Sequence, residues 1–133
     1  MTNRNKNPKT KVCSICKSRK LIKHFGKRYD YDAYRSYCRK CHLDKASKEK
    51  SERRAYVSNY KKLKGCNICG YNDERALVLH HKNPKEKTLE VSNMISRNYS
   101  SKKIKKELKK CEVLCQNCHS ILHHEERSIK KRS

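Results

Sequence analysis

Cys66-Asn-Ile-Cys69 and Cys115-Gln-Asn-Cys118 are the two stretches that decide how this chain folds. Each is a C-x2-C pair, a spacing at which a tight turn points two sulfur atoms at one ion. Two such pairs predict one tetrahedral four-cysteine zinc site, with the long segment between them returning as a hairpin. The alternative, buried free thiols, requires a large hydrophobic core, and only 34% of the chain is hydrophobic.

A second set of the same kind lies nearer the N-terminus and comprises Cys13, Cys16, Cys38 and Cys41. A disulfide framework is the alternative, but C-x2-C pairs that alternate with long loops favour zinc. His42 adjoins this second set, and we expect it on the surface rather than in the metal site. Cys111 is the ninth cysteine, and we expect it to pack as a small hydrophobic residue; exchange into the zinc site is the alternative.

Composition limits how this chain can be stabilised. Its 133 residues suffice for one domain or two very small ones. With no Trp and only one Phe, the chain cannot bury a large hydrophobic core. Metal ions must therefore supply stability that packing does not. The first residues lack the apolar core of a signal peptide, and no apolar run approaches the ~20 residues of a membrane span. We expect a reducing, cytoplasmic environment.

The charge predicts a polyanionic partner. Lys and Arg number 36 against 13 Asp and Glu, a formal charge of +23. Counting eight thiolates and two zinc ions lowers this charge by four, to +19. A merely solvated lysine-rich surface would carry balancing Glu, so we expect nucleic acid as the partner. A membrane is not expected, because no stretch pairs a basic face with a clean apolar face.

The chain divides into segments of different character. We expect a disordered basic arm at 1–11, a four-cysteine zinc ribbon at 12–43, a basic helical linker at 44–64, a metal-binding domain at 65–128 and a basic tail at 129–133. Within the metal-binding domain, the pattern predicts a strand at 76–81, a loop at 82–87, a helix from Ser100 or Ser101 to about 110, a strand at 112–114 and a helix at 119–128. The fold class is therefore small α+β and metal-stabilised.

Most of the histidines lie in the same predicted domain, 65–128, as the cysteine pairs Cys66/Cys69 and Cys115/Cys118. His119 and His123 are four residues apart on a predicted helix, so they share a face and can chelate one ion. His80 and His81 are adjacent on a strand and point to opposite faces unless the strand ends there. Four unrelated polar histidines are the alternative. Five of the seven histidines lie in this one domain, which favours an open metal site beside the closed zinc site.

These motifs carry a resemblance to a known family. Gly65-Cys-Asn-Ile-Cys-Gly70, Leu79-His-His-Lys-Asn-Pro84 and Lys110-Cys-Glu-Val-Leu-Cys-Gln-Asn-Cys-His119 resemble the zinc-bearing branch of the HNH endonucleases. The resemblance covers roughly residues 64–126 and implies a ββα-metal fold, in which a β-hairpin and a helix hold one divalent cation. The first four-cysteine unit is similar to zinc ribbons of phage nucleases, so the expected setting is a bacterial or phage-infected cell.

The resemblance also implies roles for single residues. His81 matches the general base that activates water, and His80, His119 and His123 match ligands of the catalytic cation. Relatives use an Asn before the second C-x2-C to fix the loop that carries the base. This chain has Lys110 and Cys111 near that place, so Asn93 is our first candidate for the role, with Asn83 and Asn98 as alternatives.

The three imidazole ligands also indicate which catalytic cation the site prefers. Imidazole suits zinc, nickel and similar ions, whereas magnesium prefers oxygen ligands. We therefore expect Ni²⁺, Mn²⁺ or Zn²⁺ to support cleavage better than Mg²⁺. This catalytic cation is expected in addition to the two structural Zn²⁺ ions.

Basic residues before and after the Cys66–Cys69 motif are candidates for phosphate contacts, namely Lys82, Lys85, Lys87, Arg53 and Arg54. The function that this sequence favours is metal-dependent cleavage of DNA, with double-stranded DNA as the expected substrate. A double zinc-ribbon DNA-binding protein without catalysis, such as a regulator or packaging accessory, is the alternative. RNA as substrate, the recognition sequence and the oligomeric state stay open.

Overall fold

The structure is a computed structural model that describes residues 9–30 and 32–133. It is a small mixed α+β protein that separates into two compact units, Met1–Glu49 and Lys50–Ser133. One helix, α1 (Arg39–Lys64), contains the point at which the units divide. Within the described residues, no helix is both long enough and apolar enough to span a membrane.

The first unit consists of two antiparallel hairpins. Strand β1 (Thr10–Val12) pairs with β2 (Arg19–Leu21), and β3 (Phe25–Arg28) pairs with β4 (Ala33–Cys38) after the short 3-10 helix η1 (Ile22–His24). Its core is very small and contains Cys13, Phe25 and Cys38, each at most 1% exposed. So few apolar side chains cannot stabilise the unit by burial alone.

Some expectations for this unit require correction, and others lie outside the described residues. Thr10 and Lys11 were assigned to a disordered arm, but they form β1 because their backbone pairs with β2. The rest of the arm, 1–8, lies outside the described residues, as does Tyr31. Helix α1 begins at Arg39 rather than at 44, so Cys41 lies in its first turn.

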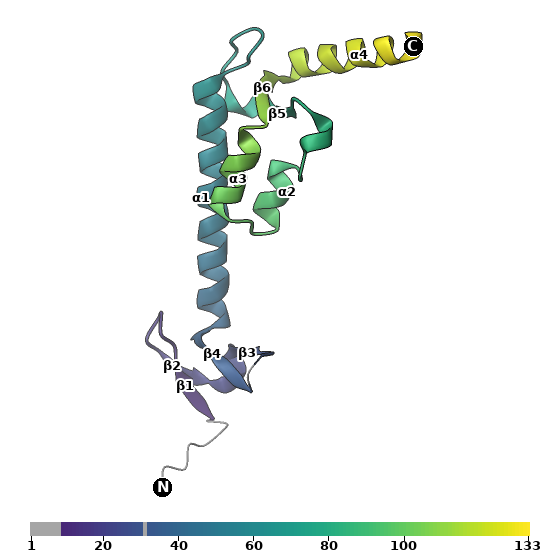
Figure 1. The fold of residues 1–133 in the computed structure, drawn as a ribbon. Coiled ribbons are helices and arrows are strands. Elements are labelled where there is room, and N and C mark those ends of the chain that lie inside the picture. Colours follow the sequence, from purple (N-terminus) through teal and green to yellow (C-terminus); the bar gives the residue numbers. More distant parts are fainter. Residues whose placement is uncertain (1–8, 31) are drawn as a thin grey trace. The chain divides into compact units, whose positions relative to one another are not determined.

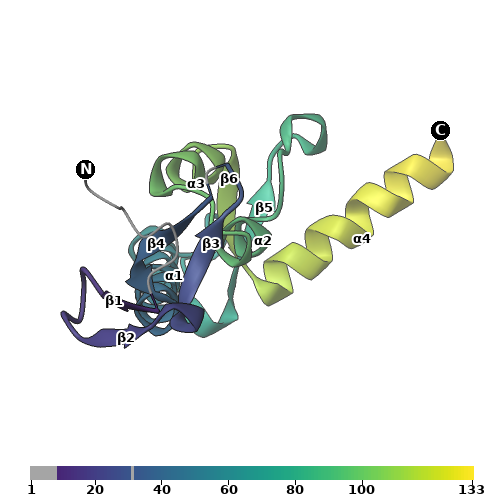
Figure 2. The same cartoon turned by 90° about the horizontal axis from the view of Figure 1, so that it is seen from below.

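The second unit places an antiparallel hairpin beside three helices (Figure 1). Strand β5 (Leu77–His81) follows the 3-10 helix η2 (Glu74–Ala76) and pairs with β6 (Cys111–Cys115). Between the strands lie η3 (Pro84–Glu86), α2 (Val91–Ser96) and α3 (Ser101–Leu108). Helix α4 (Gln116–Arg132) follows β6 directly, and in both views it extends away from the hairpin (Figures 1 and 2).

Two apolar clusters hold this second unit together. The first joins α1 to α2 and α3 and contains Val57, Val91, Met94, Ile95, Ile104 and Leu108. The second consists of hairpin residues and the first cysteine after α1, and it contains Cys66, Leu77, Val113, Leu114 and Cys115. Two of the latter five are cysteines of the predicted zinc site, so the hydrophobic core and the thiol cluster are continuous.

Most element boundaries in this unit match those expected from the sequence. Gly65 ends α1 with a φ of 64°, and the side chain of Ser100 caps α3 by accepting from the backbone N–H of Lys103. Helix α2 was not predicted. The final helix continues through most of the predicted tail at 129–133, because nothing between Ser128 and Arg132 breaks a helix.

Candidate metal centre

The four cysteines of the second unit come together at one point. Cys66 and Cys69 lie in the turn after α1, Cys115 ends β6, and Cys118 lies in the first turn of α4. Their four sulfur atoms are all within 4.8 Å of one another. The turn closes through a hydrogen bond from the backbone N–H of Gly70 to the carbonyl of Cys66, and Gly70 has a φ of 77°, which favours glycine. Four thiols so placed are able to hold a tetrahedral metal ion and are consistent with structural zinc.

The first unit repeats this arrangement with different loops. Cys13 and Cys16 lie in the turn after β1, Cys38 ends β4, and Cys41 lies in the first turn of α1. These sulfur atoms also lie within 4.8 Å of one another. The ammonium of Lys20 donates a hydrogen bond to Cys38 Sγ at 3.3 Å, so a cation already balances part of the thiolate charge. The structure thus brings together both predicted groups of four cysteines.

Electrostatics favour thiolates at matching positions in the two clusters. Burial acts to raise the pKa of Cys66, but hydrogen bonds from backbone N–H groups, Cys69 and Cys115 among them, lower it to about 6. The pKa of Cys13 is lowered to about 6 in the same way. A shared hydrogen bond with Cys115 raises the pKa of Cys118 to about 12. Four thiolates this close require a cation, and binding one releases the remaining protons.

The two residues that we expected to lie outside the zinc sites do so. Cys111 is 6% exposed, its Sγ donates to the carbonyl of Glu107 at 3.5 Å, and burial raises the pKa of its thiol to about 11. His42 stacks on Tyr37 with 5.5 Å between ring centroids. Within the described residues, neither belongs to a group of potential metal ligands.

A third cluster consists of imidazoles alone. His80 lies on β5, and His119 and His123 lie one turn apart on α4. One ring nitrogen from each lies within 4.8 Å of the others, and the Nε2 atoms of His119 and His123 are 3.0 Å apart. Burial and the two neighbouring histidines lower the pKa of His119, which favours the neutral form that binds a metal. The i,i+4 spacing predicted from the sequence is therefore realised in space.

Glu126 is a partner of this imidazole cluster that was not predicted from the sequence. Its Oε2 lies 3.2 Å from Nδ1 of His123, three residues earlier on α4. Carboxylates commonly accept the second N–H of a metal-binding histidine and so fix its ring orientation. The signal was present in the sequence, because i,i+3 neighbours meet on one helix face.

His81 lies apart from the other predicted site residues. Strand alternation points its ring away from His80, and its side chain is only 6% exposed. Its Nε2 lies 2.9 Å from Oε1 of Glu107 on α3, and Glu107 is itself 2% exposed. The structure therefore brings together His80, His119 and His123, but it does not place His81 in that cluster.

Asn93 does not contact the loop after β5. It lies on the exposed face of α2, and within the described residues no side-chain hydrogen bond joins it to His81 or to that loop. Asn83 caps η3 by accepting from the backbone N–H of Lys85, and Asn98 accepts from Arg53 at 2.8 Å. The residues that fix the loop are Glu107 and Lys110, neither of which was predicted for this role.

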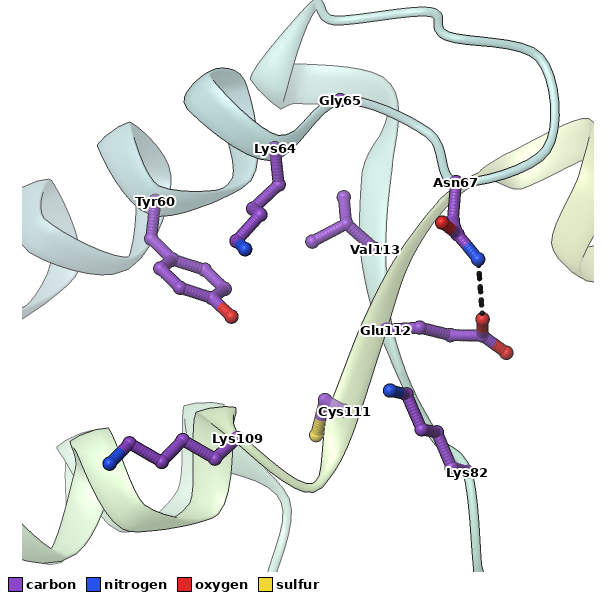
Figure 3. Close-up of a pocket in the computed structure, with 9 residues that line it drawn as sticks. All are labelled: Tyr60, Lys64, Gly65, Asn67, Lys82, Lys109, Cys111, Glu112 and Val113. Carbon is purple, nitrogen blue, oxygen red and sulfur yellow. Dashed lines mark hydrogen bonds between the residues drawn. The ribbon is translucent and has the colours of Figure 1, made fainter.

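The predicted phosphate contacts occupy separate places. Lys82 lines a cavity of about 320 Å³ between α1 and β6 together with Lys64 and Lys109, as Figure 3 shows. Cys111 and Val113 form its buried floor. Its one acid, Glu112, accepts a hydrogen bond from the amide of Asn67 at 3.1 Å. The cavity therefore carries a net positive charge, and its cations come from three different segments.

The other predicted contacts do not line this cavity. Lys85 and Lys87 are exposed in the loop after β5, and Lys87 forms an ion pair with Glu90. Arg54 is exposed on α1, whereas Arg53 is half-buried and bonded to Asn98. Lys64 and Lys109 are thus cations that the sequence did not single out.

Comparison with known proteins gives no independent assignment: no protein-family model matches the chain, and no curated protein or solved structure matches it significantly.

Proposed function

We propose that this chain is a metal-dependent DNA endonuclease of the HNH type. The observation that carries the proposal is the meeting of His80, His119 and His123 within 4.8 Å, on a hairpin and a helix joined by a four-thiol cluster. A closed thiol site would stabilise the fold, and an open imidazole site would serve chemistry. The strand–strand–helix order of β5, β6 and α4 supports the ββα-metal arrangement that the motifs imply.

The imidazole cluster fits a divalent cation by its donor set. Three ring nitrogens leave ligand positions open for water and a phosphate oxygen, as catalytic sites require. When bound, the cation polarises the scissile phosphate and stabilises the leaving oxygen. In the proposed reaction, His80, His119 and His123 hold the ion, and His81, which the resemblance matches to the general base, takes the proton from the attacking water.

The charge of the chain supports nucleic acid as the substrate. The formal charge of +23 falls only slightly when zinc-bound thiolates are counted, and the lysine-lined cavity gathers three cations beside the hairpin. Phosphates neutralise such surfaces while releasing bound counterions. Among nucleic acids, we propose double-stranded DNA because the resemblance is to enzymes that cut DNA.

Plasmid nicking tests the proposal. We expect wild-type protein to nick supercoiled plasmid faster with Ni²⁺, Mn²⁺ or Zn²⁺ than with Mg²⁺, since the ligands are imidazoles. His81→Ala should lower the rate by about 10²- to 10⁴-fold, the usual contribution of a general base.

One observation favours the non-catalytic alternative, namely that the His81 side chain is only 6% exposed. Binding without cleavage by either protein would establish that alternative, whereas equal nicking by wild type and His81→Ala would show that His81 is not the general base. A rate that is highest with Mg²⁺ alone would refute the three-imidazole cation site.

Salt dependence tests the role of the lysine-lined cavity. Lys64→Ala combined with Lys109→Ala should weaken DNA binding and flatten the plot of log affinity against log salt by about 0.9 for each phosphate that the variant no longer neutralises. Lys130→Ala combined with Lys131→Ala, at the exposed end of α4, removes the same charge elsewhere. Equal changes in slope for the two pairs would show that charge alone, and not the cavity, governs binding.

A further inference from the structure

His81, at the end of β5, and Glu107, on α3, are the only two polar or charged residues that are buried in the described part of the chain. Their side chains are 6% and 3% exposed, and they lie 26 positions apart in sequence. Helix α3, which carries Glu107, otherwise buries apolar residues, Ile104 and Leu108. A carboxylate at such a position needs several partners, because burial of an uncompensated charge is costly.

Glu107 has those partners on both oxygens. Its Oε1 accepts from the backbone N–H of Thr88 at 3.0 Å and lies 2.9 Å from Nε2 of His81. Its Oε2 accepts from the ammonium of Lys110 at 2.9 Å. Burial acts to raise the pKa of Glu107, but Lys110, Thr88 and His81 together lower it to about 2. The group is therefore a carboxylate at neutral pH.

We infer that Glu107 is a positioning residue, which fixes both the ring of His81 and the loop after β5 for the reaction proposed above. The catalytic role of Glu107 rests on the proposed function, whereas its contacts with His81 and with the loop do not depend on that function. Glu107 takes the place of the Asn that the resemblance predicts for fixing this loop.

The hydrogen bond to Glu107 sets which nitrogen of His81 is able to accept a proton. A carboxylate only accepts hydrogen bonds, so Nε2 of His81 must carry the hydrogen. In the neutral imidazole, which is the form that a general base requires, Nδ1 is then the nitrogen with a free lone pair. Glu107 thus selects the tautomer and orients the ring, and Nδ1 is the atom that takes the proton from water.

The loop after β5 is fixed by the same network. Lys110, one turn after Glu107, also donates to the carbonyl of Glu86 at 2.9 Å and to Oγ1 of Thr88 at 3.0 Å. The backbone N–H of Lys82 donates to the carbonyl of Lys110 at 3.1 Å and extends the hairpin by one bond. Both ends of the loop at 82–88 are therefore tied to the segment at 107–110.

The kinetic test compares Glu107→Ala, Glu107→Gln and Leu108→Ala in full-length, zinc-loaded protein, at a temperature where circular dichroism shows every variant folded. Glu107→Ala should lower kcat for plasmid nicking by about 10²-fold, the cost of a misplaced catalytic group, with KM almost unchanged. Glu107→Gln keeps an acceptor oxygen and should recover most of kcat. Leu108→Ala removes a neighbouring buried side chain without touching His81 and should keep the wild-type kcat.

A double-mutant comparison separates positioning from general destabilisation. Because Glu107 acts through His81, adding Glu107→Ala to His81→Ala should lower kcat no further. A further loss equal to that of the single Glu107→Ala variant would overturn the inference, and so would a wild-type kcat for Glu107→Ala.

A spectroscopic readout is independent of cleavage. Nitrogen-15 NMR at neutral pH should show the Nε2–H tautomer of His81 in the wild type and a mixture of tautomers in Glu107→Ala. If this pattern is found in a protein that cuts no DNA, the positioning by Glu107 holds and the proposed function fails. A wild-type His81 that lacks the Nε2–H tautomer would refute the inference whatever the activity.

Discussion

Replacing Cys115 with alanine should leave the second unit, Lys50–Ser133, unfolded even when zinc is present. Cys115 ends β6, pairs with Leu77 across the hairpin and caps α4 by accepting from the backbone N–H of Cys118. Structural zinc contributes an apparent ~10–16 kcal/mol to small domains at neutral pH, whereas a whole domain is stable by only ~5–15 kcal/mol. Loss of one of four thiolates therefore removes more stability than this small core is able to replace.

The measurement combines zinc analysis with thermal unfolding followed by circular dichroism. Wild-type protein should hold two tightly bound zinc ions in its cysteine clusters, and Cys115→Ala should hold one there and lose most of its cooperative transition.

Cys111→Ala is the matched control. Cys111 is also buried on β6 but lies outside the thiol cluster. This variant should keep both ions and lose only about 1 kcal/mol, a typical value for a small buried side chain. A cooperative transition and two bound zinc ions in Cys115→Ala would show that the cluster is not a structural zinc site.

Local sequence patterns predicted the parts of this molecule that depend on local geometry. Each C-x2-C turn points its own two sulfur atoms in one direction, and the i,i+4 spacing of His119 and His123 is fixed by one turn of helix. The Ser100 cap and the helix-ending Gly65 are also local, since each acts through backbone atoms a few residues away.

The features that sequence patterns did not predict depend on tertiary contacts. Helix α2 is six residues long and has no side-chain cap, so its stability comes from packing Val91, Met94 and Ile95 onto α1 and α3. The partner of His81 could not be found by spacing, because Glu107 lies on α3, 26 positions from His81, and meets it only in the tertiary structure. Asn93 was chosen by residue type, and residue type says nothing about the face of the helix on which it lies.

His119→Ala should abolish the third metal site while leaving the fold intact. His119 contributes one of three imidazoles, and its ring centroid lies 4.4 Å from that of His123 and 5.3 Å from that of His80. Two remaining imidazoles bind a divalent ion far more weakly, so affinity should fall by at least ~100-fold, the upper range for losing even an indirect partner. No residue of α4 is buried and alanine is the best helix former, so folding should be unaffected.

Titration of zinc-loaded protein with Ni²⁺ measures this loss directly, and plasmid nicking measures its consequence. The rate should fall by about 10²- to 10³-fold, comparable to removal of a principal stabiliser of transition-state charge. His124→Ala is the matched control, because His124 is exposed on the same helix and lies outside the cluster. If His119→Ala binds Ni²⁺ as the wild type does, the three histidines are not a metal site. If binding is lost while nicking persists, the cation at this site is not the catalytic one, and cleavage must be assigned elsewhere in the chain.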